Sequence, residues 1–229
     1  MNPCFETELG KLYNADCMSV LPSIDDSSVD LVVTDPPYNF DCRGRGTVHT
    51  AKDDFANNAM SPEEYVAWFK QVVDQLYRVV KDGGAVYVYC GWKLYPHVYP
   101  IIGKLFDIKN CIVWRKQHFG VGYHFRFQHE FVVFATKGKH QLRLQKRNIS
   151  DVWDIDKENN NRVHPAQKPV EAMSRPILYS TDVGGLVLDP FNGSGTTSLA
   201  AERSGRKWIG IEMDTEYCDK TIERIIKNV

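Results

Sequence analysis

The sequence predicts an α/β domain built around a mainly parallel sheet, and two observations carry that prediction. Short runs rich in β-branched and aromatic residues alternate along the chain with segments whose apolar residues repeat every three or four positions. The chain has 229 residues, 43% of them hydrophobic and 25% charged, which fits one soluble globular core. We therefore expect a single domain over residues 1–229.

The expected strands are short apolar runs bounded by turn residues. They lie at 29–34, 84–90, 110–116, 130–136, 185–189 and 207–212. Between the third and the fourth run the sequence reads HFGVGYHFRFQH, which has no helical pattern. These two strands are therefore predicted to form an antiparallel hairpin at one edge of the sheet.

The clearest helix is SPEEYVAWFKQVVDQLYRVV, residues 61–80. Ser61 and Glu64 match a capping box, and Pro62 suits the first turn. The sequence KDGG at 81–84 is predicted to end this helix. Further helices are expected at 93–105, 170–180, 196–204 and 215–228, the last of them capped by Asp214.

Several classes of protein are excluded or disfavoured. No apolar run reaches about 18 residues, so a membrane span is not expected. The first residues, MNPCFETELG, lack the pattern of a signal segment. The six cysteines include no CxxC pair, which argues against a zinc site and a disulfide framework and favours thiols in a reducing cytosol.

Positive charge gathers in one part of the chain. The net charge is −1, but residues 104–147 hold 10 Lys and Arg against two acids. Such an excess predicts a surface that contacts phosphates, or else a solvated face balanced by acidic neighbours. Two polar, irregular stretches, 39–60 and 137–163, could hold elements that recognise a partner.

A nucleotide-type site is expected in the segment LVLDPFNGSGTTSLAAERSGRKWIGIEMD, residues 186–214. It reads as strand, glycine turn, helix, strand and acid, so that Glu212 can take the hydroxyls of a ribose. Ser198 stands where a dinucleotide site has its third glycine, and Asp189 precedes the turn. An acid there disfavours a pyrophosphate and suits a cationic ligand. S-adenosylmethionine therefore ranks above NAD.

The stretch TDPPYNF, residues 34–40, ends a buried strand with an acid, two prolines and an aromatic residue. The prolines keep the backbone extended and stiff. They fix Asp35, a backbone carbonyl and Tyr38 relative to one another. This arrangement suits a flat ligand that forms hydrogen bonds, whereas a simple turn does not need such rigidity.

Together these segments resemble the amino-group DNA methyltransferases. VTDPPY precedes DPFNGSGTT, which is the order of the circularly permuted beta group of that family. RVHPAQKPVEAMSRPI, NADCMSVLPSIDDSSVDLVVTDPPY and RFQHEFVVFATKG match further family segments, so that the resemblance spans residues 10 to 228. It implies a Rossmann-like methyltransferase fold with helices on both faces of the sheet. It also implies methyl transfer from S-adenosylmethionine to an amine of DNA, without metal, in the cytoplasm of a prokaryotic or viral host cell.

The catalytic residues expected from this resemblance are Asp35, Pro36, Pro37 and Tyr38. The Asp35 carboxylate and the Pro36 carbonyl would each accept one N–H of the target amine, which turns its lone pair toward the methyl group. Tyr38 would stack on a base flipped out of the duplex.

Two further sets of residues complete the expected site. The cofactor residues are Asp16 for the adenine, Glu212 for the ribose, and Asp35, His164, Lys168, Asp189, Phe191, Asn192, Gly193, Ser194, Gly195, Thr196, Thr197 and Met213. The DNA contacts are Arg115, Lys116, His124, Arg126, Lys137 and Lys139.

Some placements stay open in the sequence. Phe125, Arg126 and Phe127 could enter the gap left by a flipped base or pack under the sheet. His164 and Lys168 could instead be surface residues. The cluster of Tyr87, Tyr89 and Trp92 is expected to be core or pocket wall.

The alternatives for function are also several. In the family, an acid before PPY is more typical of adenine enzymes and a serine of cytosine enzymes, so Asp35 favours adenine N6 over cytosine N4. RNA or a protein glutamine amide, a binding protein without turnover, and an NAD oxidoreductase rank lower. Only about 25 residues separate FATKGK from HPAQKP, which predicts a minimal enzyme with little room for target recognition. The partner is DNA, and a homodimer is left open.

Overall fold

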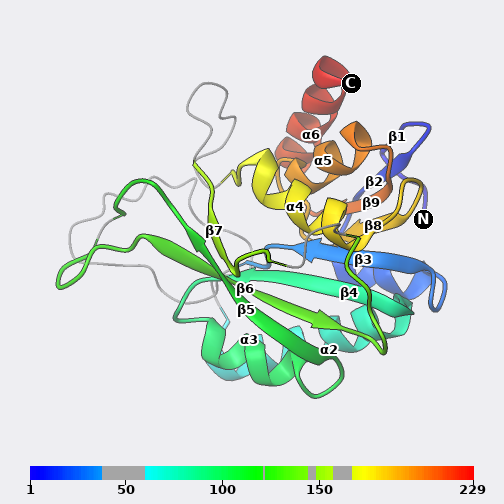
Figure 1. The fold of residues 1–229 in the computed structure, drawn as a ribbon. Coiled ribbons are helices and arrows are strands. Elements are labelled where there is room, and N and C mark those ends of the chain that lie inside the picture. Colours follow the sequence, from blue (N-terminus) through cyan, green and yellow to red (C-terminus); the bar gives the residue numbers. More distant parts are fainter. Residues whose placement is uncertain (38–59, 121, 144–147, 157–166) are drawn as a thin grey trace.

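The computed structural model describes residues 1–37, 60–120, 122–143, 148–156 and 167–229. These residues form one nine-stranded sheet with helices on both faces (Figure 1). The strands are β1 (Phe5–Glu6), β2 (Gly10–Asn14), β3 (Val29–Thr34), β4 (Val80–Cys90), β5 (Asp107–Arg115), β6 (His129–Thr136), β7 (Val152–Asp154), β8 (Leu186–Asp189) and β9 (Lys207–Glu212). Their order across the sheet is β1-β2-β9-β8-β3-β4-β6-β5-β7.

The sheet is mainly parallel, as predicted. Strands β2, β9, β8, β3 and β4 run in one direction, and β1 pairs antiparallel with β2. The predicted hairpin is β5 and β6, and β6 also pairs antiparallel with β4. Strand β7, which the sequence did not predict, lies outside β5 and falls within the stretch 137–163 expected to be irregular.

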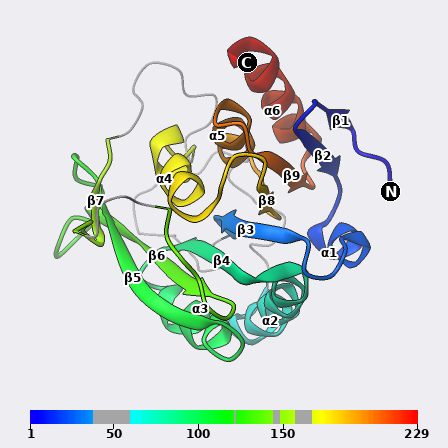
Figure 2. The ribbon, with the colours of Figure 1, turned by 45° about the vertical axis from the view of Figure 1, so that its right-hand side comes forward.

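The helices cover the two faces in order of sequence. They are α1 (Cys17–Val20), the 3-10 helix η1 (Leu21–Ser23), α2 (Pro62–Val79), α3 (Tyr95–Ile102), α4 (Val170–Ser180), α5 (Thr196–Arg203) and α6 (Thr215–Asn228). Helices α1 to α3 pack on one face, and α4 to α6 pack on the other (Figures 1 and 2).

Strand β3 shows why the sheet lies in the middle of the fold. Val32 packs with the α1–α3 core, whereas Leu31 and Val33 pack with the α4–α6 core. All three side chains are fully buried. A strand covered on both faces is a continuous apolar run, which explains the sequence VDLVV.

Helix α2 begins as predicted and ends differently. The Ser61 hydroxyl accepts from the Glu64 N–H at 3.1 Å, and the Glu64 carboxylate accepts from the Ser61 N–H at 2.7 Å. The helix ends at Val79 and β4 starts at Val80, so the KDGG sequence lies within the strand and is not a turn. Helix α3 is also shorter than the predicted 93–105.

Two expected absences can be compared with the structure. Across the described ranges, no helix has both the length and the apolar character needed to cross a membrane. The five cysteines in these ranges are free thiols, and Cys17, Cys90 and Cys218 are buried.

Candidate active site

The carboxyl ends of the parallel strands meet at one edge of the sheet, and the sequence-predicted acids gather there. Asp16 follows β2, Glu212 closes β9, Asp189 closes β8 and Asp35 follows β3. These four strands are neighbours in the sheet. Ligands of open α/β sheets bind outside this edge. The register thus assembles residues that are up to 196 positions apart in sequence.

The glycine turn after β8 approaches its neighbours closely at one glycine and leaves space at the other. Gly195 has a φ of 78°, and a Cβ there would lie 2.5 Å from the Thr221 methyl group. Gly193 has a φ of 51°, and a Cβ there would meet no atom within 4 Å. Gly195 therefore lets α5 pack against α6, whereas Gly193 leaves open space beside the backbone.

Asp189 fastens the turn to the sheet. Its carboxylate accepts hydrogen bonds from the Thr34 hydroxyl at 2.7 Å, the Thr197 hydroxyl at 2.6 Å and the Phe191 N–H at 3.1 Å. Burial raises the pKa of Asp189 to about 6, although these hydrogen bonds act in the opposite direction. Only 4% of the residue is exposed, so its contact with a cationic ligand remains a prediction.

Other side chains of the turn also face the protein. Asn192 accepts from the Ser198 hydroxyl at 2.6 Å, and the Ser194 carbonyl accepts from Arg224 at 2.5 Å. The Thr196 hydroxyl donates to the Lys168 carbonyl at 3.4 Å. Sequence reasoning assigned the whole turn to the cofactor, whereas these contacts give Asn192, Ser194 and Thr196 a role in holding its shape.

Phe191 packs toward the face of the sheet that α1 to α3 cover. Its ring lies 5.5 Å from that of Trp68 in α2, and the residue is half-buried. It therefore closes the site on the α2 side.

Glu212 and Asp16 are held by backbone groups. The Glu212 carboxylate accepts from the Gly193 N–H and the Asp214 N–H, each at 2.8 Å. Burial raises the pKa of Glu212, and these backbone donors oppose the change. Asp16 caps α1 by accepting from the Met18 N–H at 2.7 Å and is exposed.

Asp35 is paired with Lys168. The Lys168 ammonium lies 2.5 Å from the Asp35 carboxylate and 3.1 Å from that of Glu130. Glu130 also pairs with Lys116. The Lys168 side chain therefore contacts Asp35, the candidate catalytic acid, and the sequence did not reveal this contact. Because Lys168 is buried, the alternative that it is a surface residue is wrong.

The charged side chains around Lys168 shift one another's pKa values. Burial would raise the pKa of Glu130, but the ammonium groups of Lys168 and Lys116 lower it to about 2. Burial would lower the pKa of Lys168, but the Asp35 and Glu130 carboxylates raise it above its ordinary value. Glu130 and Lys168 are thus both charged over the neutral range.

Aromatic residues form the wall around Lys168. Its ammonium lies 6.0 Å from the centre of the Tyr89 ring and 5.9 Å from that of Trp114. The Tyr89 hydroxyl donates to the Ala172 carbonyl at 2.5 Å. Tyr89 therefore belongs to the hydrophobic core and also lines the surroundings of Lys168. Trp92 is half exposed and lies outside the core.

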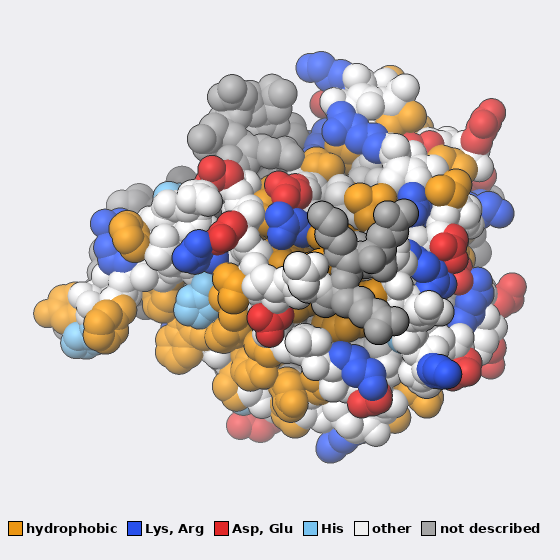
Figure 3. Space-filling view, in the orientation of Figure 1, with side chains coloured by type: hydrophobic (Ala, Val, Ile, Leu, Met, Phe, Trp, Pro, Cys, Tyr) orange, Lys and Arg blue, Asp and Glu red, His pale blue; other side chains and the backbone are white. Residues whose placement is uncertain are grey.

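An aromatic arm, residues 117–120 and 122–128, extends from the β5–β6 hairpin. The Lys116 N–H donates to the Gln128 carbonyl at 2.7 Å and the Gly120 N–H to the Phe127 carbonyl at 2.6 Å, which continues the hairpin beyond the sheet. Figure 1 shows this green projection, and Figure 3 shows hydrophobic and histidine side chains gathered at its end. Tyr123 is 96% exposed and Phe125 88% exposed, so Phe125 does not pack under the sheet.

The six residues predicted to contact DNA separate into three groups. His124 and Arg126 lie on the arm. Arg115 pairs with Asp154, and Lys116 pairs with Glu130. The remaining two, Lys137 and Lys139, follow the end of β6, where the Lys137 ammonium donates to carbonyls at the junction of α2 and β4. They lie at the edge of the sheet opposite Asp35.

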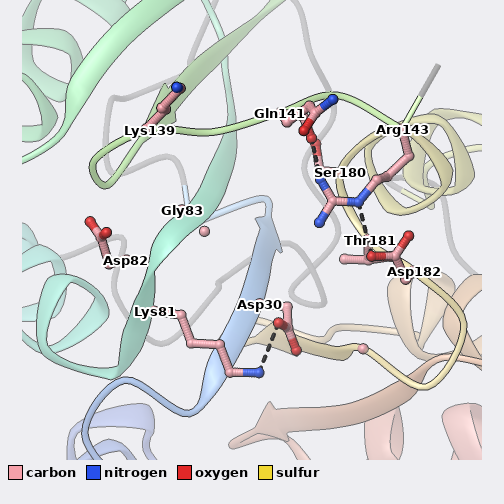
Figure 4. Close-up of a pocket in the computed structure, with 12 residues that line it drawn as sticks. Asp30, Lys81, Asp82, Gly83, Lys139, Gln141, Arg143, Ser180, Thr181 and Asp182 are labelled. Atoms are coloured by element: carbon pink, nitrogen blue, oxygen red, sulfur yellow. Dashed lines mark hydrogen bonds and ion pairs between the residues drawn. The ribbon is translucent and has the colours of Figure 1, made fainter. Parts of the chain in front are cut away.

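That opposite edge also holds a cavity of about 310 Å³ (Figure 4). Four of the charged side chains that line it form two ion pairs, Lys81 with Asp30 at 2.8 Å and Arg143 with Asp182 at 3.0 Å. Five residues of extended strand separate Asp30 from Asp35, which corresponds to roughly 16 Å. The cavity is therefore separate from the candidate active site.

The residues at the carboxyl edge fit the expected cofactor. The open space beside Gly193 lies next to the Glu212 carboxylate, whose oxygens retain lone pairs for hydroxyl donors. Asp35 and Asp189 supply negative charge, which suits a ligand with cationic groups and no phosphate. Tyr38, His164 and nearly all of the stretch 39–60 lie outside the described residues, and so do parts of the stretch 137–163.

Two similar proteins match nearly the whole of this chain. A protein called DNA adenine methyltransferase YhdJ from Escherichia coli (strain K12) is 30% identical over 96% of this chain and 84% of its own length. A Type II methyltransferase, M.BglII from Bacillus subtilis, is 30% identical over 92% of this chain and 67% of its own length.

Solved structures show the same fold. The cytosine-N4-specific PvuII DNA methyltransferase superposes with a TM-score of 0.82 at 23% identity, over 99% of this chain and 90% of that one. The TTHA0409 protein of Thermus thermophilus, complexed with S-adenosyl-L-methionine, has a TM-score of 0.73 at 25% identity and covers 96% and 94%. The family model described as DNA methylase, N6_N4_Mtase, matches residues 29–224. The resemblance seen in the sequence is thus confirmed, and the chain belongs to the N6_N4_Mtase family of DNA methylases.

Proposed function

We propose that this chain transfers a methyl group from S-adenosylmethionine to the N6 amine of adenine in DNA. The observation that carries the proposal is the position of Asp35. It follows β3 at the edge where Glu212 and the open space beside Gly193 also lie. An acceptor for an amine and a site for an adenosine-containing cofactor are therefore neighbours.

The protein's task in this reaction is to prepare the amine. S-adenosylmethionine supplies a methyl group that is already activated on a positively charged sulfur. The lone pair of the exocyclic amine is delocalised into the base, which makes the nitrogen a poor nucleophile. Asp35 and the Pro36 carbonyl accept its two N–H groups and localise that lone pair. The nitrogen would then form the new N–C bond, the C–S electron pair would stay on sulfur, and the nitrogen would release one proton to the solvent.

The prolines favour this use of the carbonyl. Pro36 is buried and Pro37 half-buried, so the backbone after β3 is held in place. Within the described part of the chain, no donor reaches the Pro36 carbonyl. It is thus an acceptor available for a substrate N–H.

Adenine is the base that we favour. In the family an acid before PPY is more typical of adenine enzymes, and YhdJ is named a DNA adenine methyltransferase. Cytosine N4 is the alternative, because the same two acceptors suit either amine and the similar PvuII enzyme is cytosine-N4-specific.

The aromatic arm is our candidate for the DNA contact. It grows from β5 and β6 at the same edge as Asp35, because β6 starts where β4 ends and β4 is parallel to β3. Its sequence contains one arginine, two histidines and no acid. Exposed aromatic rings can stack on bases, and a base must leave the duplex to reach Asp35. We propose that Tyr123 and Phe125 occupy the gap left by the flipped adenine, with Tyr38 stacking on that adenine.

Incubation with labelled S-adenosylmethionine and unmethylated DNA of mixed sequence tests the function. Nucleoside mass spectrometry should then find the label on N6 of adenine. Label on cytosine would select the alternative, and no label on either base would reject methyl transfer to DNA. Asp35→Ala serves as the inactive control.

A further inference from the structure

The Lys168 side chain contacts two carboxylates, those of Asp35 and Glu130, which lie in different parts of the sheet. Asp35 follows β3, Glu130 lies in β6, and Lys168 precedes α4. The ammonium touches both carboxylates, at 2.5 Å and 3.1 Å, and only 10% of the Lys168 side chain is exposed. Sequence reasoning placed this lysine on the cofactor, so the contact with Asp35 requires a different explanation.

The surroundings hold the ammonium in one place. The Thr196 hydroxyl donates to the Lys168 carbonyl, which ties the segment before α4 to the start of α5. The faces of Tyr89 and Trp114 flank the ammonium. Each ring is anchored in turn, because the Trp114 indole N–H donates to the Ile155 carbonyl at 3.0 Å and the Tyr89 hydroxyl to the Ala172 carbonyl.

The charges alternate along the group. Asp35 is negative, Lys168 positive, Glu130 negative and Lys116 positive, with contacts between each neighbouring pair. A buried ammonium requires such compensation, since an unpaired buried charge is costly. Glu130 therefore allows Lys168 to remain charged inside the protein.

The contact has a consequence for the methyl acceptor. A carboxylate accepts an amine N–H well only if it is ionised and correctly oriented. Lys168 binds the Oδ2 atom of Asp35 and so restrains its rotation. An ammonium at this distance also favours the ionised form.

We propose that Lys168 is a positioning residue, which Glu130 holds in place and which fixes the Asp35 carboxylate as the acceptor for the target amine. This inference rests on the proposed function and assigns Lys168 to the reacting amine, through Asp35, and not to the cofactor.

Other titratable groups surround Asp35 and bear on any pH test. They come from four elements or their ends and are Tyr65 in α2, Tyr89 and Cys90 in β4, Glu130 in β6 and Asp189 in β8. Burial raises the pKa of each of the two tyrosines and of Cys90, so these three stay neutral in acid. Asp189, whose pKa burial raises to about 6, also titrates in the acid range, and the negative charge of Asp35 adds to that rise.

The test compares Lys168→Met with Lys168→Arg, which keeps the charge. We expect the methionine variant to lower kcat about 10²-fold, since misplacing a reacting group has effects of this size. The acid limb of its kcat profile should move to higher pH, because the ammonium beside the Asp35 carboxylate is removed. Its Kd for S-adenosylmethionine by calorimetry should stay within about threefold, and arginine should restore part of kcat. Lys70→Met, on the exposed face of α2, is the matched control.

Glu130→Gln supplies an independent test. We expect kcat to fall about tenfold or more, because Lys168 loses its contact with the Glu130 carboxylate. Its acid limb should not rise, since the positive charge beside Asp35 remains. If Lys168→Met does not fold, as judged by circular dichroism, Glu130→Gln and Lys168→Arg decide the question.

The outcomes separate the two proposals. An inactive wild-type chain would reject the proposed function, and the inference would fall with it. An active wild type with an unchanged kcat in Lys168→Met would reject the inference alone. So would a Lys168→Met variant that loses cofactor affinity but keeps kcat at saturating cofactor.

Discussion

The Thr34 hydroxyl at the end of β3 donates a 2.7 Å hydrogen bond to the Asp189 carboxylate at the end of β8. Thr34 precedes Asp35, and Asp189 precedes the glycine turn. This hydrogen bond therefore fixes the segment that we propose to bind the amine relative to the glycine turn, although 155 positions separate the two residues in sequence.

The buried Asp189 carboxylate predicts a pH-dependent stability. Its pKa of about 6 lies above the value of 3.8 for an exposed aspartate. The stability that this group contributes is therefore fully present below about pH 4 and is lost as pH rises through 6. Relative to Asp189→Asn, wild type should lose roughly 2 kcal/mol of unfolding free energy between pH 4 and pH 7. Urea denaturation of both proteins at several pH values measures this difference, and parallel pH dependences would contradict it.

Removing the Asp35 carboxylate should stop methyl transfer. We expect Asp35→Ala to lower kcat at least about 10³-fold, because the amine loses its charged acceptor. Cofactor affinity should persist, since Glu212 and the glycine turn are untouched. Single-turnover transfer of labelled methyl and calorimetry measure the two quantities. Full activity in this variant would exclude the proposed role of Asp35.

Glu212 should contribute to cofactor affinity. Glu212→Ala removes the carboxylate that we propose as the acceptor for ribose hydroxyls, and it removes the acceptor of the Gly193 N–H. We expect the Kd for S-adenosylmethionine to rise about 10- to 100-fold, as for lost hydrogen bonds to charged groups. Glu216→Ala, on the exposed first turn of α6, is the control. An unchanged Kd in Glu212→Ala would argue against the ribose role.

The aromatic arm should matter for duplex DNA and little for stability. Tyr123→Ser and Phe125→Ser remove rings that are almost fully exposed, so the unfolding free energy should change by less than about 0.5 kcal/mol. The variants should methylate duplex DNA more slowly than wild type does. They should methylate single-stranded DNA nearly as fast as wild type, because a single strand needs no base flipping. Ile226→Ser, an exposed apolar residue on α6, is the control.

The salt response gives a second measurement on the arm. Arg126→Ala should reduce the slope of log K against log salt by about one. The ring variants could instead methylate duplex DNA as fast as wild type does, and Arg126→Ala could leave the salt slope unchanged. These two results together would place the DNA contact elsewhere.

Much of the fold was readable because its signals are local. The periodicity and capping box of α2, and the six apolar runs, depend on neighbours within a few residues. Strand β2 escaped prediction because Gly10–Asn14 is short and only Gly10 and Leu12 are buried in it. Its identity as a strand depends on pairing with β9, nearly 200 residues later.

The site was readable by residue type and less so by contact. The sequence predicted that Asp35 and Glu212 stand at the ends of recognisable strands, and the structure places Asp35 directly after β3 and Glu212 at the end of β9. It could not show that Lys168 binds Asp35, because that contact depends on how three distant segments meet. Nor could it show that Trp92 stacks on Phe127 outside the core, with ring centres 6.3 Å apart.

The strand order has a consequence for how the chain is made. Strands β8 and β9 lie between β2 and β3, although they are the last two strands in sequence. During synthesis, β2 and β3 therefore leave the ribosome well before β8 and β9, the two strands that lie between them in the sheet. Only when Glu212 has emerged can the middle of the sheet close, so a stalled chain would present two unpaired strand edges to chaperones and proteases.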